Sequence, residues 1–120
     1  MRKFEKLDVY QKSLEFTVNV YDFSKKLPDN EKFGIISQLR RATMSISLNI
    51  AEGAGSGFDT EFGRFLKIAM RSTYEVHAII DIIEKLKLSD QESLEKLREE
   101  LDEISAMIFG LIKKIKKSDS

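Results

Sequence analysis

Apolar residues recur along the chain at the three- and four-residue spacing of one-sided helices. Residues 8–27 are predicted to form a first helix whose apolar positions cover an unusually wide arc, so we expect this helix to contact two neighbours. The arc consists of two stripes. One holds Tyr10, Leu14, Val18 and Tyr21, and the other holds Val9, Phe16, Val20, Phe23 and Leu27.

The same periodicity predicts three more helices, over about residues 31–52, 60–87 and 90–117. Gly53 is well placed to end the second helix, and Asp59 can cap the third. Ser89 and Glu92 have the spacing of a capping box at the start of the fourth. Short connections favour antiparallel neighbours, so the expected fold is all-α, an up-down-up-down four-helix bundle with residues 1–120 as a single domain.

Composition narrows the class of protein. Twenty Lys and Arg balance twenty Asp and Glu, so any nucleic-acid binding must be local. There is no cysteine and no apolar run of the length that a membrane span requires. We therefore expect a cytoplasmic protein with no membrane association and more apolar surface than one bundle can bury, which favours assembly into a homo-oligomer.

Charge is distributed unevenly along the last predicted helix. Acidic residues dominate its first half, and Lys113, Lys114, Lys116 and Lys117 follow near its end. Cations in a last turn favour the negative end of the helix dipole, and they could equally contact RNA. The acidic half could dock a basic protein partner.

The residues offer little to an enzyme. His77 is the single histidine and has no Glu three residues before it, so neither a metal site of the di-iron type nor a catalytic triad is indicated. The glycine-rich residues 53–57 lack the lysine of a phosphate-binding P-loop and are more typical of a connector, although the amides that follow could hold an anion. We expect no catalytic residue, no metal and no cofactor.

A polar stripe runs along the second predicted helix, opposite its apolar core positions. Its members are Gln38, Arg41, Ser45, Asn49 and Glu52. A solvated face would more often show Lys and Glu, so this stripe favours a polar network or a subunit interface over ligand binding. Met44 and Leu48 flank it.

Five cations on the two central helices could form a basic groove for phosphates. They are Arg40, Arg41, Arg64, Lys67 and Arg71. Interhelical ion pairs with Glu52, Glu61 and Glu75 are the alternative interpretation.

Several segments resemble the four-helix bundle family of 23S ribosomal RNA intervening-sequence proteins. Residues 37–42 (SQLRRA) and 45–53 (SISLNIAEG) carry the most specific likeness, and residues 7–12 and 61–75 extend it. The chain departs from the usual family pattern at Ala54, Ser56 and Arg71, so the 53–57 loop lacks its customary cation.

The resemblance implies a bacterial, homopentameric ring of bundles without catalytic activity, associated with structured RNA or serving as a scaffold. A related branch consists of accessory proteins of diversity-generating retroelements, which are pentamers that bind a reverse transcriptase. A protein-recruiting adaptor of that kind is therefore the alternative function.

Overall fold

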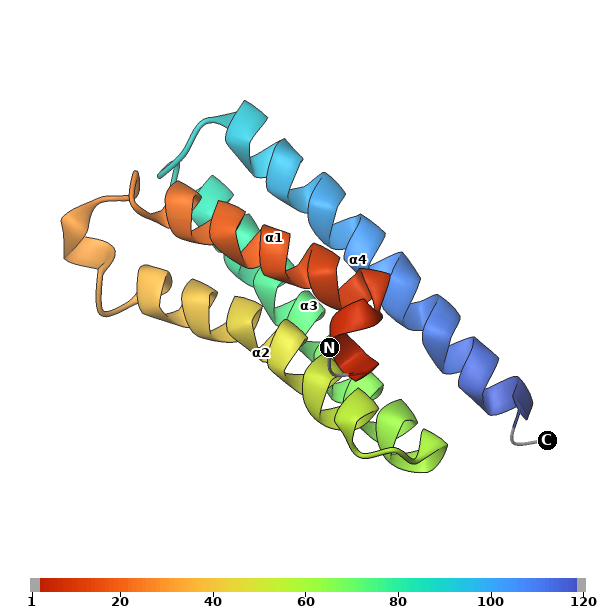
Figure 1. Ribbon diagram of the computed structural model, residues 1–120. Helices are drawn as coiled ribbons and strands as arrows, with labels where there is room; N and C mark the ends of the chain where they lie inside the picture. The colour runs from red at the N-terminus through yellow and green to blue at the C-terminus, as the bar shows by residue number, and fades with distance from the viewer. Residues whose placement is uncertain (1–2, 119–120) are drawn as a thin grey trace.

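A computed structural model of the chain describes residues 3–118. Four long helices run side by side: α1 (Asp8–Ser24), α2 (Ile35–Gly55), α3 (Asp59–Lys85) and α4 (Gln91–Ser118), with short 3-10 helices η1 (Lys3–Lys6) and η2 (Asp29–Glu31) (Figure 1). No strand occurs within this part of the chain. The molecule is therefore all-α, as the periodicity predicts.

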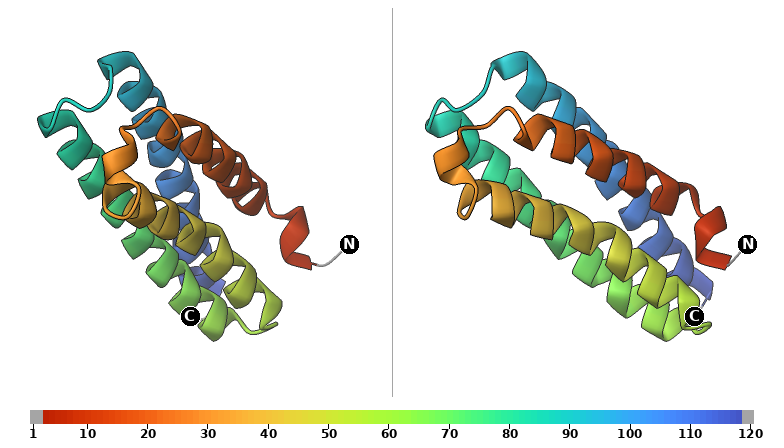
Figure 2. Two further views of the ribbon diagram at one scale, coloured as in Figure 1. Left: turned by 90° about the vertical axis from the view of Figure 1, so that its left-hand side faces the viewer. Right: turned by 60° about the vertical axis from the view of Figure 1, so that its left-hand side comes forward.

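Successive helices are antiparallel. The α1–α2 and α3–α4 connections lie at one end of the bundle, whereas the α2–α3 turn, η1 and the end of α4 lie at the other (Figure 2). Each helix packs against two neighbours in a closed ring, and the α2–α3 contact is the most extensive. The expected contact of the first helix with two neighbours, α2 and α4, is confirmed. The body is elongated, with principal extents of 48 × 24 × 19 Å.

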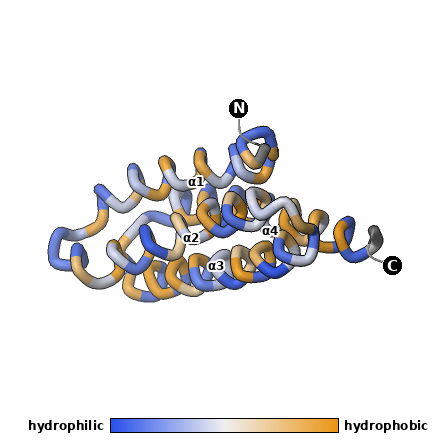
Figure 3. Tube along the Cα trace, turned by 60° about the horizontal axis from the view of Figure 1, so that its bottom comes forward, coloured by the Kyte–Doolittle hydropathy of each residue, from blue (hydrophilic) through white to orange (hydrophobic). Residues whose placement is uncertain are grey.

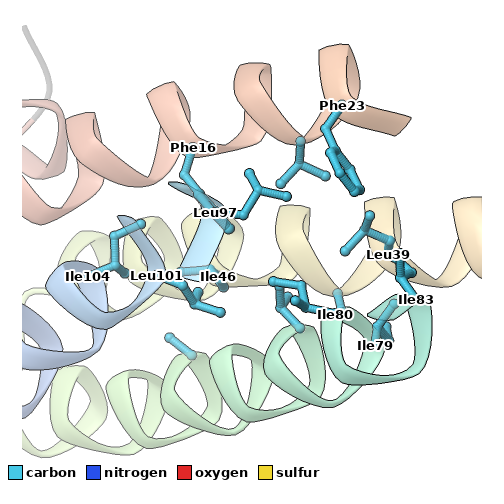
Figure 4. Close-up of a cluster of buried hydrophobic side chains, with 14 of the residues drawn as sticks. Phe16, Phe23, Leu39, Ile46, Ile79, Ile80, Ile83, Leu97, Leu101 and Ile104 are labelled. Atoms are coloured by element: carbon cyan, nitrogen blue, oxygen red, sulfur yellow. The ribbon is translucent and has the colours of Figure 1, made fainter. Parts of the chain in front are cut away.

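The core comes from one face of each helix. Hydrophobic and hydrophilic positions alternate along every helix with the helical period, which leaves one side of each apolar (Figure 3). Phe16, Leu39, Ile46, Ile80 and Leu101 are fully buried and meet between the four helices (Figure 4). Burying such aliphatic and aromatic side chains contributes roughly 1.5–3 kcal/mol each and is the main force that holds the bundle together.

The first two helix boundaries differ from the sequence-based prediction. α1 ends at Ser24 instead of residue 27, and the chain turns so that the buried side chain of Leu27 still reaches the core. α2 begins at Ile35 instead of residue 31 because η2 and Gly34, whose backbone is not helical, intervene. α2 also continues to Gly55, so the prediction that Gly53 ends it was wrong.

The caps of the last two helices also differ. Asp59 is the first residue of α3, and Phe58 before it supplies no side-chain cap. At α4 the amide of Ser93 donates to Asp90 Oδ2 at 2.8 Å, so the cap is Asp90 and the predicted Ser89 capping box was off by one residue. α3 ends at Lys85, and Lys87 adopts a left-handed φ of 56° that lets the Leu88 amide donate back to the carbonyl of Ile83.

Candidate functional site

The predicted polar stripe lies on the outer face of α2, opposite the residues that α2 buries. Gln38, Arg41 and Glu52 are exposed, whereas Ser45 and Asn49 are half-buried beside α3. The structure thus divides the stripe into an exposed part and a part that contacts a neighbouring helix.

The half-buried part is a small hydrogen-bond network. Asn49 Nδ2 donates to the backbone oxygen of Ser45 at 2.7 Å and to its hydroxyl at 3.0 Å. The Ser72 hydroxyl of α3 donates to Ser45 Oγ at 2.9 Å. Ser45 and Asn49 therefore help to fix α2 against α3, because partly buried polar groups are stable only when they are paired.

The exposed part is available to a partner. Gln38 and Arg41 make no side-chain hydrogen bond or ion pair with any residue between 3 and 118. Glu52 is close enough to Arg64 to help raise the pKa of that guanidinium, although hydrogen bonding with Glu61 is the larger cause.

Next to the stripe lies an exposed apolar area, which we call the apolar α1–α2 surface and define as Leu14, Val18, Met44 and Leu48. Val18 and Leu48 are each 60% exposed, and Leu14 and Met44 are more than one third exposed. One of the two apolar stripes predicted on the first helix is thus buried, while part of the other faces solvent. The two-stripe pattern was the sequence signal for this surface, but the sequence could not tell which stripe is covered.

Arg40 does not join the other predicted cations. Its Nε donates to the buried Ser24 hydroxyl at 2.8 Å, and its guanidinium lies 4.4 Å from the ring centroid of Tyr21. Arg40 is half-buried between α1 and α2. It therefore connects two helices and is poorly placed to contact a phosphate.

Arg64, Lys67 and Arg71 share one side of α3 and are exposed. Arg64 donates two hydrogen bonds to Glu61 at 3.0 and 3.1 Å, an ion pair within α3 and not the interhelical pair considered from the sequence. The same pairing lowers the pKa of Glu61. Lys67 and Arg71 form no ion pair within residues 3–118, which leaves their charge exposed.

A cleft of about 420 Å³ opens between the start of α3 and the end of α4. Arg64 and Lys67 line it from α3, and Lys116 lines it from α4. Among the described residues, Asp59 is the acidic one that lines it. The cleft therefore adds a cation that sequence reasoning had not grouped with the α3 cations, because only the fold brings residue 116 beside residue 64.

The acidic half of α4 is largely engaged in surface pairs with other residues of the chain. Glu103 pairs with Lys12 of α1 at 2.7 Å and raises the pKa of that lysine, and Glu100 accepts a hydrogen bond from Asn19. Arg98 binds Glu95 of its own helix and the carboxylates of Asp81 and Glu84 on α3. These contacts leave fewer acidic groups for a basic protein partner.

His77 lies on the flank of α3, where Nε2 is 3.2 Å from Asp102 Oδ1. Among the described residues no three His, Asp or Glu side chains are grouped so that they could hold a metal ion. None of the helices in residues 3–118 is both long and apolar enough to cross a membrane.

Comparison with known proteins decides the family. The sequence model of the 23S rRNA-intervening sequence protein family matches residues 5–110, a range that spans all four helices. The chain belongs to this family. The four-helix architecture and the family likeness of residues 37–42 and 45–53 are thereby confirmed.

A solved structure of similar sequence has the same fold. The chain is similar to a protein of unknown function from the S23 ribosomal protein family of Bacteroides thetaiotaomicron VPI-5482, with 27% sequence identity and a TM-score of 0.82. The alignment covers 88% of this chain and 95% of the other. No curated protein matches the chain.

Proposed function

We propose that this chain works as a self-assembling helical bundle, a homopentamer that associates with RNA or serves as a scaffold, and that it is not an enzyme. The observation that carries the proposal is the apolar α1–α2 surface beside the exposed part of the polar stripe. A contiguous apolar area rimmed by polar groups is typical of protein interfaces, where a dry centre is surrounded by hydrogen-bonding side chains.

The composition of this area suits a second copy of the chain. Val18 and Leu48 supply the apolar centre, and Gln38 and Arg41 supply donors without partners among residues 3–118. Arginine is enriched in interfaces because its planar group makes several hydrogen bonds at once. The number five comes from the resemblance to the family, and the association with RNA is supported by the family's description and by the exposed cations of α3.

The experiment is to place charges in the proposed interface. Val18→Glu combined with Leu48→Glu should convert the assembly to a monomer, because burying two unpaired carboxylates costs more than the interface gains. Light scattering at micromolar concentration should give five times the 13.8 kDa chain mass for the parent protein and the single-chain mass for the variant.

Phe33→Glu is the matched control, because Phe33 is 91% exposed and lies in the connection between η2 and α2, away from this surface. It makes the same kind of change and should leave the mass unaltered. Circular dichroism checks that all variants keep their helices. A parent protein that is monomeric at these concentrations would refute the proposal.

A further inference from the structure

One face of the molecule combines exposed aromatic rings with cations, most of which form no ion pair with a described residue. We call it the basic α3–α4 face and define it as Arg64, Lys67, Arg71 and Tyr74 of α3 with Phe109, Lys113 and Lys116 of α4. It lies along the seam between the two helices, toward the end of the bundle where α4 ends. It is separate from the apolar α1–α2 surface.

The contacts between α3 and α4 set the register of this face. His77 is paired with Asp102, and Gly63 lies against Ile115. One step forward along α3 therefore corresponds to about one step backward along the antiparallel α4. Phe109, seven residues after Asp102 and on the same side of α4, is therefore level with Met70. Tyr74 is four residues from Met70, which is about 6 Å along the axis.

Both rings face solvent. Tyr74 is 62% exposed and Phe109 is 56% exposed. The ammonium of Lys113 lies 5.3 Å from the ring centroid of Phe109. Exposed aromatic residues occur singly on many surfaces and then need no explanation. Here two of them lie about one helical turn apart along the axis, and each ring has a cation near it on its own helix.

Cations predominate around the rings, and the nearest carboxylate of α4 on this side, Asp102, is paired with His77. Lys67, Arg71, Lys113 and Lys116 form no ion pair with any described residue, whereas Arg64 is held by Glu61. α4 has no acidic residue from 105 to 118, although its first half is acidic. Asp59 is the acidic group that lines the adjoining cleft. A chain with no net charge has thus concentrated cations on this face.

We propose that the basic α3–α4 face binds single-stranded nucleic acid, with bases stacked on Tyr74 and Phe109 and phosphates held by Lys67, Arg71, Lys113 and Lys116. Aromatic platforms inside a cationic groove are the recurrent means of binding single strands. A duplex has its bases already stacked and would use only the cations. The proposal rests on the RNA association proposed above and specifies its site.

The test measures fluorescence anisotropy of a labelled oligouridylate with the full-length protein. Tyr74→Ala combined with Phe109→Ala should weaken binding about twenty-five-fold or more, since each of the two stacked bases contributes about five- to a hundredfold to affinity. Lys67→Ala combined with Lys113→Ala should weaken binding and make it less dependent on salt, because fewer counterions are released.

The chain contains a matched control for the ring and cation pair. Lys32 lies over the ring of Phe33, with the ammonium 5.8 Å from the centroid, at the other end of the bundle. Lys32→Ala combined with Phe33→Ala removes the same chemical groups as Lys113→Ala combined with Phe109→Ala. If binding is confined to the basic α3–α4 face, the Lys32 and Phe33 variant should change the affinity for the oligouridylate less than about twofold.

Three further results would overturn the proposal. They are no binding of the oligouridylate at low salt, equal binding to a duplex of the same length, and equal binding of polyglutamate, which would indicate a site for any acidic polymer or protein. A labelled oligodeoxyuridylate distinguishes RNA from DNA, and either single strand supports the proposed site. The mass of every variant is measured by light scattering, so a failure of self-assembly is recognised separately from a failure of this site.

Discussion

Thr43 carries a hydroxyl group in the middle of the apolar core. It is fully buried on α2, and its Oγ1 has no hydrogen-bond partner among the described residues. Burying an unpaired hydroxyl costs about 1–3 kcal/mol, whereas valine has the same shape without the polar atom. Thr43→Val should therefore raise the free energy of unfolding by about 1 kcal/mol, as measured by chemical denaturation.

Thr73→Val is the control for this prediction. Thr73 is equally buried, but its hydroxyl donates to the backbone oxygen of Met70 at 2.7 Å. Removing a satisfied hydroxyl should be neutral or should lower stability. A Thr43→Val protein that is no more stable than the parent would show that the Thr43 hydroxyl is in fact satisfied.

Single residues also show where sequence reasoning reaches its limit. Ile36, Leu39, Ile46 and Ile50 recur at helical spacing and all lie in the core, because this spacing fixes the angle of each side chain around its helix. The angle of Arg40 around the helix was not enough to separate it from the surface cations. Its burial depends on Ser24 and Tyr21 of another helix, which no pattern within residues 35–55 contains.

At the scale of helices, the contact between α2 and α3 depends on Gly53. A Cβ atom at this position would lie 2.6 Å from the Cβ of Phe65 and 3.3 Å from the Cα of Phe62. The sequence suggested a helix end because glycine is common there, whereas the actual reason is a close approach of two helices. Gly53→Ala should force them apart and lower the free energy of unfolding by about 1–3 kcal/mol, despite the better helix propensity of alanine.

Gly110→Ala provides the opposite case in the same experiment. Gly110 also lies within a helix, but a Cβ there would meet no described atom within 4 Å, so this glycine serves no close approach between helices of the bundle. Alanine should then raise stability by about 0.5–1 kcal/mol through helix propensity. If both substitutions had the same sign in thermal unfolding, the close contact at Gly53 would not be the controlling effect.

The cap of α4 makes its stability depend on pH. The carboxylate of Asp90 accepts hydrogen bonds from the amide and the hydroxyl of Ser93, both at 2.8 Å, and these bonds hold the pKa of Asp90 below its usual value. Because the pKa is lower in the folded state, the Asp90 carboxylate stabilises the fold at pH values above the unfolded-state pKa of about 4. This stabilisation is lost as the pH falls through the folded-state pKa.

Asp90→Ala should therefore be less stable than the parent at neutral pH, and the difference should shrink as the pH falls below about 4. Thermal unfolding of both proteins over a pH series gives the measurement. Ser89→Ala is the control and should behave like the parent, since the cap is one residue later than the sequence indicated. A constant difference between Asp90→Ala and the parent at all pH values would contradict the assignment.

For the whole molecule, the sequence predicted four helices, their order and a surplus of apolar surface, because these follow from local periodicity and chain length. It did not predict which surfaces stay exposed. The cations of residues 64–71 and the lysines that begin at Lys113 were two separate sets in the sequence, and only the antiparallel register of α3 and α4 brings members of both together. Long-range grouping of this kind depends on packing between helices, which periodicity alone does not describe.

Self-assembly through the apolar α1–α2 surface predicts that thermal stability depends on concentration. Unfolding of an oligomer releases chains, so mass action favours the folded assembly as the protein becomes more concentrated. For a pentamer of chains of this length, the unfolding temperature should rise by roughly 3–6 °C for each tenfold increase in concentration. Val18→Glu combined with Leu48→Glu changes exposed residues and leaves the core intact. As a monomer, this variant should unfold at the same temperature at every protein concentration. A parent protein whose unfolding temperature is independent of concentration would mean that the apolar α1–α2 surface contributes nothing to folding in solution.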